Sequence, residues 1–181
     1  MLILGTVSSS IKKGDMTLIA NTTLTSTSTA ITFSSVSGYK DLYLLTSTRS
    51  THSGNVIDVT IEINSSTSNF TSYLLQHNGE QSYAVANPQS GRDISVAPGS
   101  TASSNYFGVA ETYILNYNSS NTRKSILSHD ILTRNASGSS GGYAETYNIN
   151  WANTSAITSI TVRSSAGNLA TGSTATLYGI N

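Results

Sequence analysis

The chain has 181 residues, which predicts one domain long enough to bury a core of its own. Nine Lys and Arg balance nine Asp and Glu, so the chain lacks the basic excess that nucleic-acid binding requires. Cysteine is absent, which excludes disulfides and thiolate zinc sites, and no apolar run approaches the length of a membrane span. A neutral chain rich in Ser and Thr has little charge repulsion between copies and favours close assembly with other subunits.

Residues 1–15 stand apart as an extended N-terminal arm. The Lys12–Asp15 segment is typical of a turn or linker. The arm lacks a basic start and is too short for a signal peptide, so we expect a soluble protein with nothing that marks it for export. It is predicted either to pack on its own sheet or to lie on a neighbouring subunit. The residues expected to make these contacts are Met1, Leu2, Ile3, Leu4, Val7 and Ile11.

Residues 16–181 alternate between strand patterns and turns rich in Ser, Thr, Asn and Gly, with no amphipathic helix. The pattern predicts ten strands, at Met16–Leu24, Ala30–Ser34, Asp41–Arg49, Val56–Ile63, Phe70–Gln76, Tyr106–Tyr117, Arg123–Leu132, Tyr143–Asn150, Ile157–Ser164 and Ser173–Ile180. Short strands at regular spacing indicate an all-β protein, a single antiparallel β-sandwich of jelly-roll or Greek-key type.

Three segments carry more detailed expectations. Val56–Ile63 alternates most clearly and should direct its isoleucines and Val59 inward. Asp41–Arg49 is apolar on both faces near its middle, which is typical of a central strand. His77–Asn105 contains both prolines and is predicted to be a long irregular segment, either an interaction loop or a solvated excursion, in which only Tyr83–Ala86 and Ile94–Val96 could pair.

Candidate catalytic groups do not form a recognisable pattern. No two of the three histidines have metal-ligand spacing, and adjacent His129 and Asp130 would point to opposite faces of a strand. No Gly-x-Ser-x-Gly motif occurs. Carboxylates that could supply a glycosidase pair lie in no motif; they are Asp58, Glu62, Glu80, Glu111 and Glu145. We therefore expect no enzymatic activity, no catalytic residues, no metal and no cofactor.

Aromatic residues are the remaining candidates for binding. Near predicted loops lie Tyr83, Tyr106, Tyr143, Tyr147 and the single tryptophan, Trp151. Aromatic side chains at loops suit sugar stacking or protein interfaces, and the alternative is that they cap the ends of the sandwich.

The ordered set of segments resembles structural proteins of tailed bacteriophages of the marine and cyanophage type. The similarity is collinear over nearly the whole chain and rests on Ile3–Ser9, Thr17–Thr23, Ile31–Val36, Tyr39–Leu42, Ile114–Lys124, Trp151–Ile160 and Ala175–Ile180.

The resemblance implies a virion component without enzymatic activity. We expect a capsid decoration, or cement, protein on the capsid surface. Its expected partners are the major capsid protein and further copies of itself in a homotrimer. The arm would contact one of these partners. The alternative is a tail-fibre or receptor-binding module whose aromatic loops, with Tyr83, Tyr106, Tyr143 and Trp151, hold a host surface glycan. Neither role involves nucleic acid or membrane.

Overall fold

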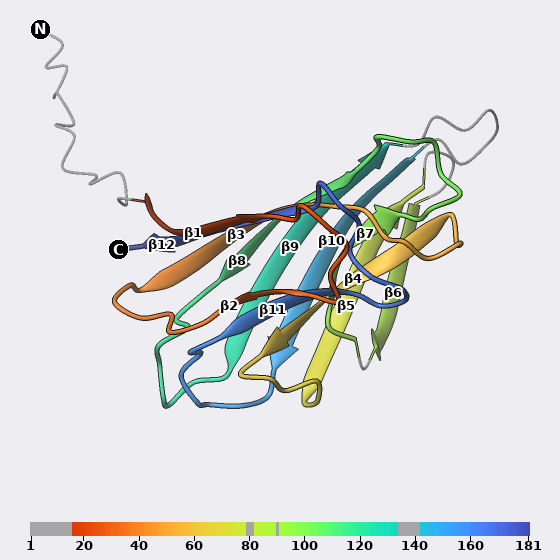
Figure 1. Cartoon of the computed structure of the whole chain (residues 1–181). Coiled ribbons are helices and arrows are strands. Elements are labelled where there is room, and N and C mark those ends of the chain that lie inside the picture. Colours follow the sequence, from red (N-terminus) through yellow and green to blue (C-terminus); the bar gives the residue numbers. More distant parts are fainter. Residues whose placement is uncertain (1–15, 79–81, 90, 134–141) are drawn as a thin grey trace, which may run out of the picture.

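The computed structural model describes residues 16–78, 82–89, 91–133 and 142–181, and these form an all-β sandwich of two antiparallel sheets (Figure 1). Twelve strands follow one another along the described residues. They are β1 (Met16–Thr23), β2 (Ile31–Phe33), β3 (Asp41–Thr48), β4 (Val56–Ile63), β5 (Phe70–His77), β6 (Ser82–Gln89), β7 (Asp93–Pro98), β8 (Gly108–Ile114), β9 (Lys124–Thr133), β10 (Gly142–Trp151), β11 (Ile160–Ser164) and β12 (Thr174–Ile180).

The two sheets differ in width. The large sheet has eight strands in the order β1-β12-β3-β8-β9-β10-β5-β6, and the small sheet has four in the order β2-β11-β4-β7. All pairings are antiparallel. The prediction that Asp41–Arg49 forms a central strand is confirmed, because β3 lies between β12 and β8.

Several successive strands lie in the same sheet, and β8, β9 and β10 follow one another side by side in the large sheet. β5 and β6 pair with each other within the large sheet, as do β9 and β10. These four strands lie together at one end of the large sheet. Without them, each sheet has four strands, β1-β12-β3-β8 facing β2-β11-β4-β7. The two hairpins therefore widen the large sheet beyond the width of the small one.

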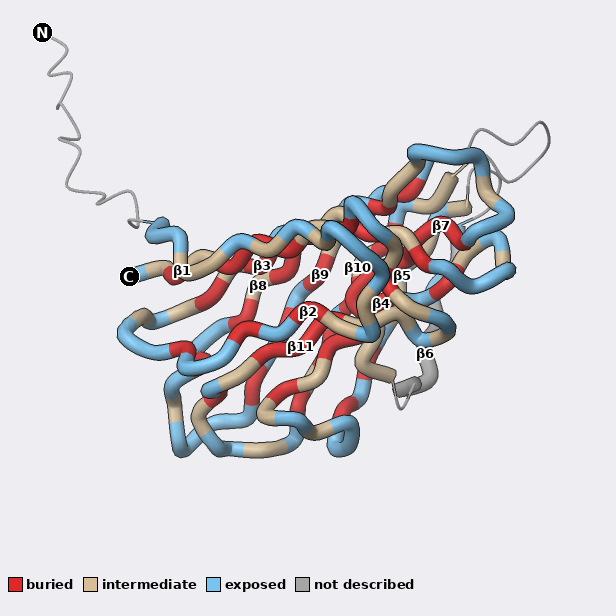
Figure 2. Tube along the Cα trace, in the orientation of Figure 1, coloured by how far each residue is buried: buried red, intermediate tan, exposed pale blue. Residues whose placement is uncertain are grey.

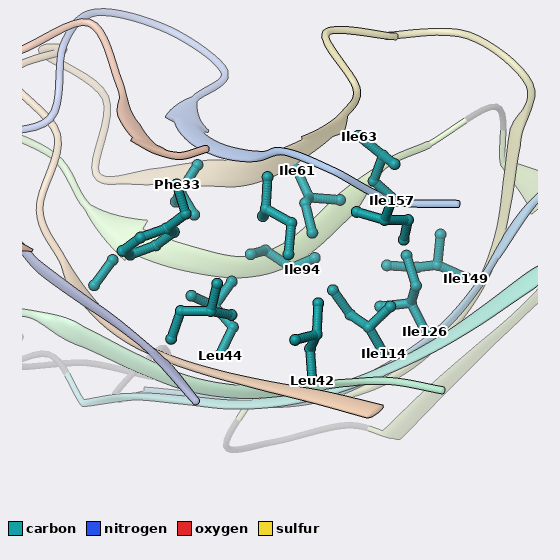
Figure 3. Close-up of a cluster of buried hydrophobic side chains, with 14 of the residues drawn as sticks. Phe33, Leu42, Leu44, Ile61, Ile63, Ile94, Ile114, Ile126, Ile149 and Ile157 are labelled. Carbon is teal, nitrogen blue, oxygen red and sulfur yellow. The ribbon is translucent and has the colours of Figure 1, made fainter. Parts of the chain in front are cut away.

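The core lies between the sheets (Figure 2). Figure 3 shows Leu42, Leu44 and Ile114 of the large sheet pointing toward Phe33 and Ile61 of the small sheet. The inward direction predicted for β4 is confirmed, since its core residues Ile57, Val59, Ile61 and Ile63 are all buried. Burial of this aliphatic layer supplies the main driving force for sandwich formation.

The prediction of a long irregular segment at His77–Asn105 is wrong, because it contains β6 and β7. The two short pieces that were expected to pair, Tyr83–Ala86 and Ile94–Val96, do lie within these strands. Both strands lie at sheet edges, where proline is tolerated because one row of N–H groups has no ladder partner. Pro88 lies in β6 and Pro98 ends β7. Proline and low hydrophobicity obscured both strands in the sequence. The described residues contain no helix with the length and apolarity to cross a membrane.

Candidate functional site

The outer face of the large sheet, directed away from the core, carries an unusual set of exposed apolar side chains. In β3, β8 and β9 these residues alternate with buried ones, so they point outward. Ile131 is 65% exposed and Leu75 is 59% exposed. The large exposed hydrophobic residues of the described chain all lie in this sheet or directly after β8; they are Met16, Leu18, Leu45, Tyr73, Leu75, Val109, Leu115, Leu127 and Ile131.

Cross-strand register aligns an aromatic and aliphatic row across this outer face. In order from β1 to β5 the row contains Leu18, Tyr178, Tyr43, Tyr113, Leu127, Asn148 and Tyr73. The rings of Tyr43 and Tyr113 lie 4.8 Å apart between centroids, and those of Tyr43 and Tyr178 lie 6.1 Å apart. Packed rings of this kind form a rigid surface that loses little side-chain entropy when it is covered.

A second row places the charged and polar groups of the outer face beside one another. Its members, from β3 to β5, are Leu45, Glu111, His129, Thr146 and Leu75. Glu111 Oε2 accepts a hydrogen bond of 3.0 Å from the Tyr43 hydroxyl, and His129 Nδ1 lies 3.0 Å from Thr146 Oγ1. Burial and the Glu111 carboxylate raise the pKa of Tyr43 to about 12. Polar groups that already have partners cost less to cover with another protein.

The outer face is hollowed and large enough for a protein contact. Leu45, Val109 and Ile131 line a hollow of about 210 Å³ with Glu111 and His129. Six strand spacings separate β1 from β5, which is about 29 Å, and the seven residues of β8 span about 20 Å. The whole outer face, polar groups included, therefore measures roughly 600 Å². Large exposed apolar patches rimmed by polar residues mark interaction surfaces.

A second candidate site is a polar cleft on the inner side of the sandwich. It forms where β10 and β5 extend past the edge of the small sheet, and its volume is about 320 Å³. Carboxylates from three strands enter it, namely Asp58 of β4, Asp93 of β7 and Glu145 of β10. The remaining lining residues are Val56, Ser72, Leu74, Gln76, Val96, Tyr143 and Tyr147.

Burial perturbs the acidic groups of the cleft. Burial raises the pKa of Asp93 to about 6, and the nearby charge of Asp58 adds to the rise. The pKa values of Asp58 and Glu145 are also raised by burial. Glu145 is held by two donors, Gln76 Nε2 and the Tyr147 hydroxyl, the latter with an oxygen–oxygen distance of 2.5 Å. The cleft therefore offers carboxyl groups, an amide and tyrosines to a ligand.

Asp130 lies next to the cleft residue Glu145 and links the large sheet to the edge of the small sheet. It pairs with Glu145 across β9 and β10, and its Oδ2 accepts a 2.9 Å hydrogen bond from the Val96 N–H at the edge of β7. Ser128, two residues earlier, donates its hydroxyl to the Ile94 carbonyl at 2.6 Å. These side chains satisfy edge groups of β7 that have no neighbouring strand in the small sheet.

The predicted binding residues are distributed unevenly over these features. Tyr143 is the second residue of β10 and lines the cleft, whereas Tyr106 lies before β8, where its carbonyl accepts a hydrogen bond from Arg49. Tyr83 lies in β6, opposite Gln76. The expectation that Trp151 offers a surface contact is wrong, because it is 1% exposed and stacks on Phe70 in the core. The arm residues Met1, Leu2, Ile3, Leu4, Val7 and Ile11 lie outside the described residues.

The fold separates His129 from Asp130 and Glu111 from Glu145, but it brings Asp58 and Glu145 into one cleft. His129 points to the outer face and Asp130 to the core, which confirms that they point in opposite directions. Glu111 lies on the outer face, whereas Glu145 lies in the cleft. Glu62 forms ion pairs with Arg92 and Arg163. Within the described residues no group of three or more His, Asp or Glu side chains could hold a metal ion.

Sequence reasoning missed the outer face, although its signal was present. Val109 and Tyr113 alternate along one strand, as do Tyr73 and Leu75 along another, but apolar residues on a strand face are ordinarily assigned to the core. Only the position of the small sheet shows that these residues point outward. No protein-family model matches the chain, and a search of curated proteins finds no significant match.

Proposed function

We propose that this chain is a structural protein of a tailed-phage virion that decorates the capsid, and that it acts by protein–protein contact. The observation that carries the proposal is the apolar outer face of the large sheet. That face exposes Ile131, Leu75 and Val109 around a few polar groups that already have partners. A surface of this composition favours another protein surface over water.

The strand order supports the same proposal. The arrangement of β1-β12-β3-β8 against β2-β11-β4-β7 is compatible with an eight-stranded jelly roll in which β5–β6 and β9–β10 are inserted hairpins. Viral capsid proteins and lectins both use the jelly roll, so the fold agrees with a virion role without deciding between scaffold and glycan binder. The resemblance of the sequence to phage structural proteins favours the scaffold.

The mechanism is adhesion by many weak contacts. One face of roughly 600 Å² is below the ~800 Å² per partner of a standard stable interface. A single copy would therefore bind weakly, but copies joined on a lattice would bind with a high effective concentration. The balanced charge of the chain permits such close packing.

Antibody labelling of intact virions, viewed by negative-stain electron microscopy, tests the location. Label spread evenly over the heads is the expected result. Label confined to the tail tip would contradict the decoration role and favour the second candidate.

The second candidate is a receptor-binding module that holds a host glycan in the polar cleft. Carboxyl groups, the Gln76 amide and Tyr143 are the kinds of group that bind sugar hydroxyls and stack on sugar rings. Calorimetric titration with the host's surface polysaccharide tests this role. Saturable binding that Tyr143→Ala removes and Tyr73→Ala retains would support it, since Tyr73 lies on the outer face.

A further inference from the structure

We propose that the outer face of the large sheet is the docking site for the apolar segment Met1–Ile11 of a neighbouring copy of this chain. This inference rests on the proposed assembly function and deepens it by naming what covers the face. Three features of the chain support it: the chemistry of the segment, its length, and the place at which the chain enters the sheet.

The first support is chemical complementarity. Five of the eleven residues in Met1–Ile11 are aliphatic, namely Leu2, Ile3, Leu4, Val7 and Ile11, and none is charged. The outer face offers exposed Leu45, Val109, Leu127 and Ile131 around its hollow. Each aliphatic side chain that enters the face removes apolar surface from water on both partners.

The second support is length. Eleven extended residues reach up to about 36 Å. The outer face measures about 29 Å from β1 to β5, because neighbouring strands lie about 4.8 Å apart. One segment therefore has the reach to cross every strand that contributes an exposed apolar residue.

The third support is the entry point of the chain. β1 is an edge strand, and its exposed Met16 and Leu18 form the rim of the outer face. Leu18 is paired with Tyr178 and so begins the aromatic row itself. The chain that precedes Met16 thus joins the sheet at a corner of the apolar face.

The charged linker favours a neighbouring copy over the chain's own face. Residues 12–15, Lys-Lys-Gly-Asp, separate the apolar segment from β1. Own-face docking would turn these charges back across the apolar rim at Met16 and Leu18, where they would lose hydration. Docking on another molecule lets the linker stay in water. Because the segment and the face are different surfaces, the contact is head-to-tail and closes into a ring when the rotation between copies permits.

The test combines solution mass with peptide binding. Sedimentation velocity measures the mass of the full chain and of a chain lacking residues 1–11. The truncated chain retains β1–β12 and the buried cluster between the sheets, which lie within 16–181. Fluorescence anisotropy then follows a labelled peptide of sequence Met1–Ile11 added to truncated protein. Ile131→Asp places a charge on the face, and Ser100→Asp places the same charge on an exposed loop as the matched control.

The proposal predicts an oligomeric full chain, a monomeric truncated chain, and saturable peptide binding to the truncated protein. Ile131→Asp should weaken peptide binding at least tenfold and dissociate the full-length oligomer, whereas Ser100→Asp should change neither. Peptide binding unaffected by Ile131→Asp, or no binding at all, would overturn the site. A monomeric full chain whose truncated form still binds peptide would show own-face docking and overturn the exchange between copies. If the antibody does not label capsids but the peptide still binds the truncated protein, the capsid role alone would be rejected.

Discussion

The side chain of Asp130 accepts the hydrogen bond that a neighbouring strand would otherwise accept from Val96. The Val96 N–H donates to Asp130 Oδ2 at 2.9 Å. Asp130 is only 3% exposed, and its second oxygen, Oδ1, has no hydrogen-bond partner among the residues that the structure describes. Burial raises the pKa of Asp130 to about 8, and the Glu145 carboxyl adds to the rise. The edge of the small sheet is therefore held by a group that is costly to ionise.

Stability should fall as pH rises through the titration of this group. The pKa of Asp130 is about 8 in the folded chain and 3.8 in the reference state, so the folded chain binds more protons between about pH 4 and pH 8. Thermal unfolding should show a Tm at pH 5 above that at pH 8.5 by roughly 5 °C or more.

Asp130→Asn should flatten much of this pH dependence and raise the Tm at pH 8.5, because the amide oxygen can still accept from Val96 without a charge. A Tm in the native protein that is constant, or that rises from pH 5 to pH 8.5, would contradict the account of this edge.

Lys124 should stabilise the loops at the end of the sandwich where β9 begins. Its side chain is fully buried, and its Nζ donates to the carbonyls of Ser119, Thr122 and Thr154 at 2.7, 2.7 and 3.2 Å. Burial lowers the pKa of Lys124. Lys124→Met leaves these carbonyls without their donor and should cost about 2–4 kcal/mol of unfolding free energy in urea titration. Lys40→Met, at an exposed position, is the control and should cost little.

Gly108 should not tolerate a side chain. A Cβ at this position would lie 2.2 Å from the Val96 carbonyl oxygen, so β7 packs directly on the backbone of β8. Gly108→Ala would force the two strands apart and should destabilise the protein by about 1–3 kcal/mol, measured by the urea midpoint. An unchanged midpoint would show that β7 does not lie this close to β8.

Trp151 should report on the core and not on a ligand. It is buried and stacks on Phe70 with ring centroids 6.2 Å apart. Its fluorescence should lie at shorter wavelength in the native protein than in urea, and iodide should quench it weakly until the protein unfolds. Strong quenching of the native protein would place the indole at the surface.

The sequence predicted much of the fold because period-two alternation is a local property. Val56–Ile63 was delimited correctly, since its buried isoleucines alternate with Asp58 and Glu62. The two candidate surfaces, the outer face and the cleft, depend on tertiary placement. Val109 and Ile131 are as apolar as core residues, and only the arrangement of the sheets directs them outward. Asp130 lies at an inward position, where the alternating pattern predicts an apolar residue. It is polar because the N–H of Val96 at the edge of β7 needs a hydrogen-bond acceptor there.

Co-sedimentation with phage heads that lack this protein tests the proposed capsid role most directly. The full chain and the Ser100→Asp control should pellet with the heads, and Ile131→Asp should remain largely in the supernatant because loss of contact between copies removes avidity. A full chain that stays in the supernatant at saturating head concentration would contradict the assignment as a capsid decoration protein.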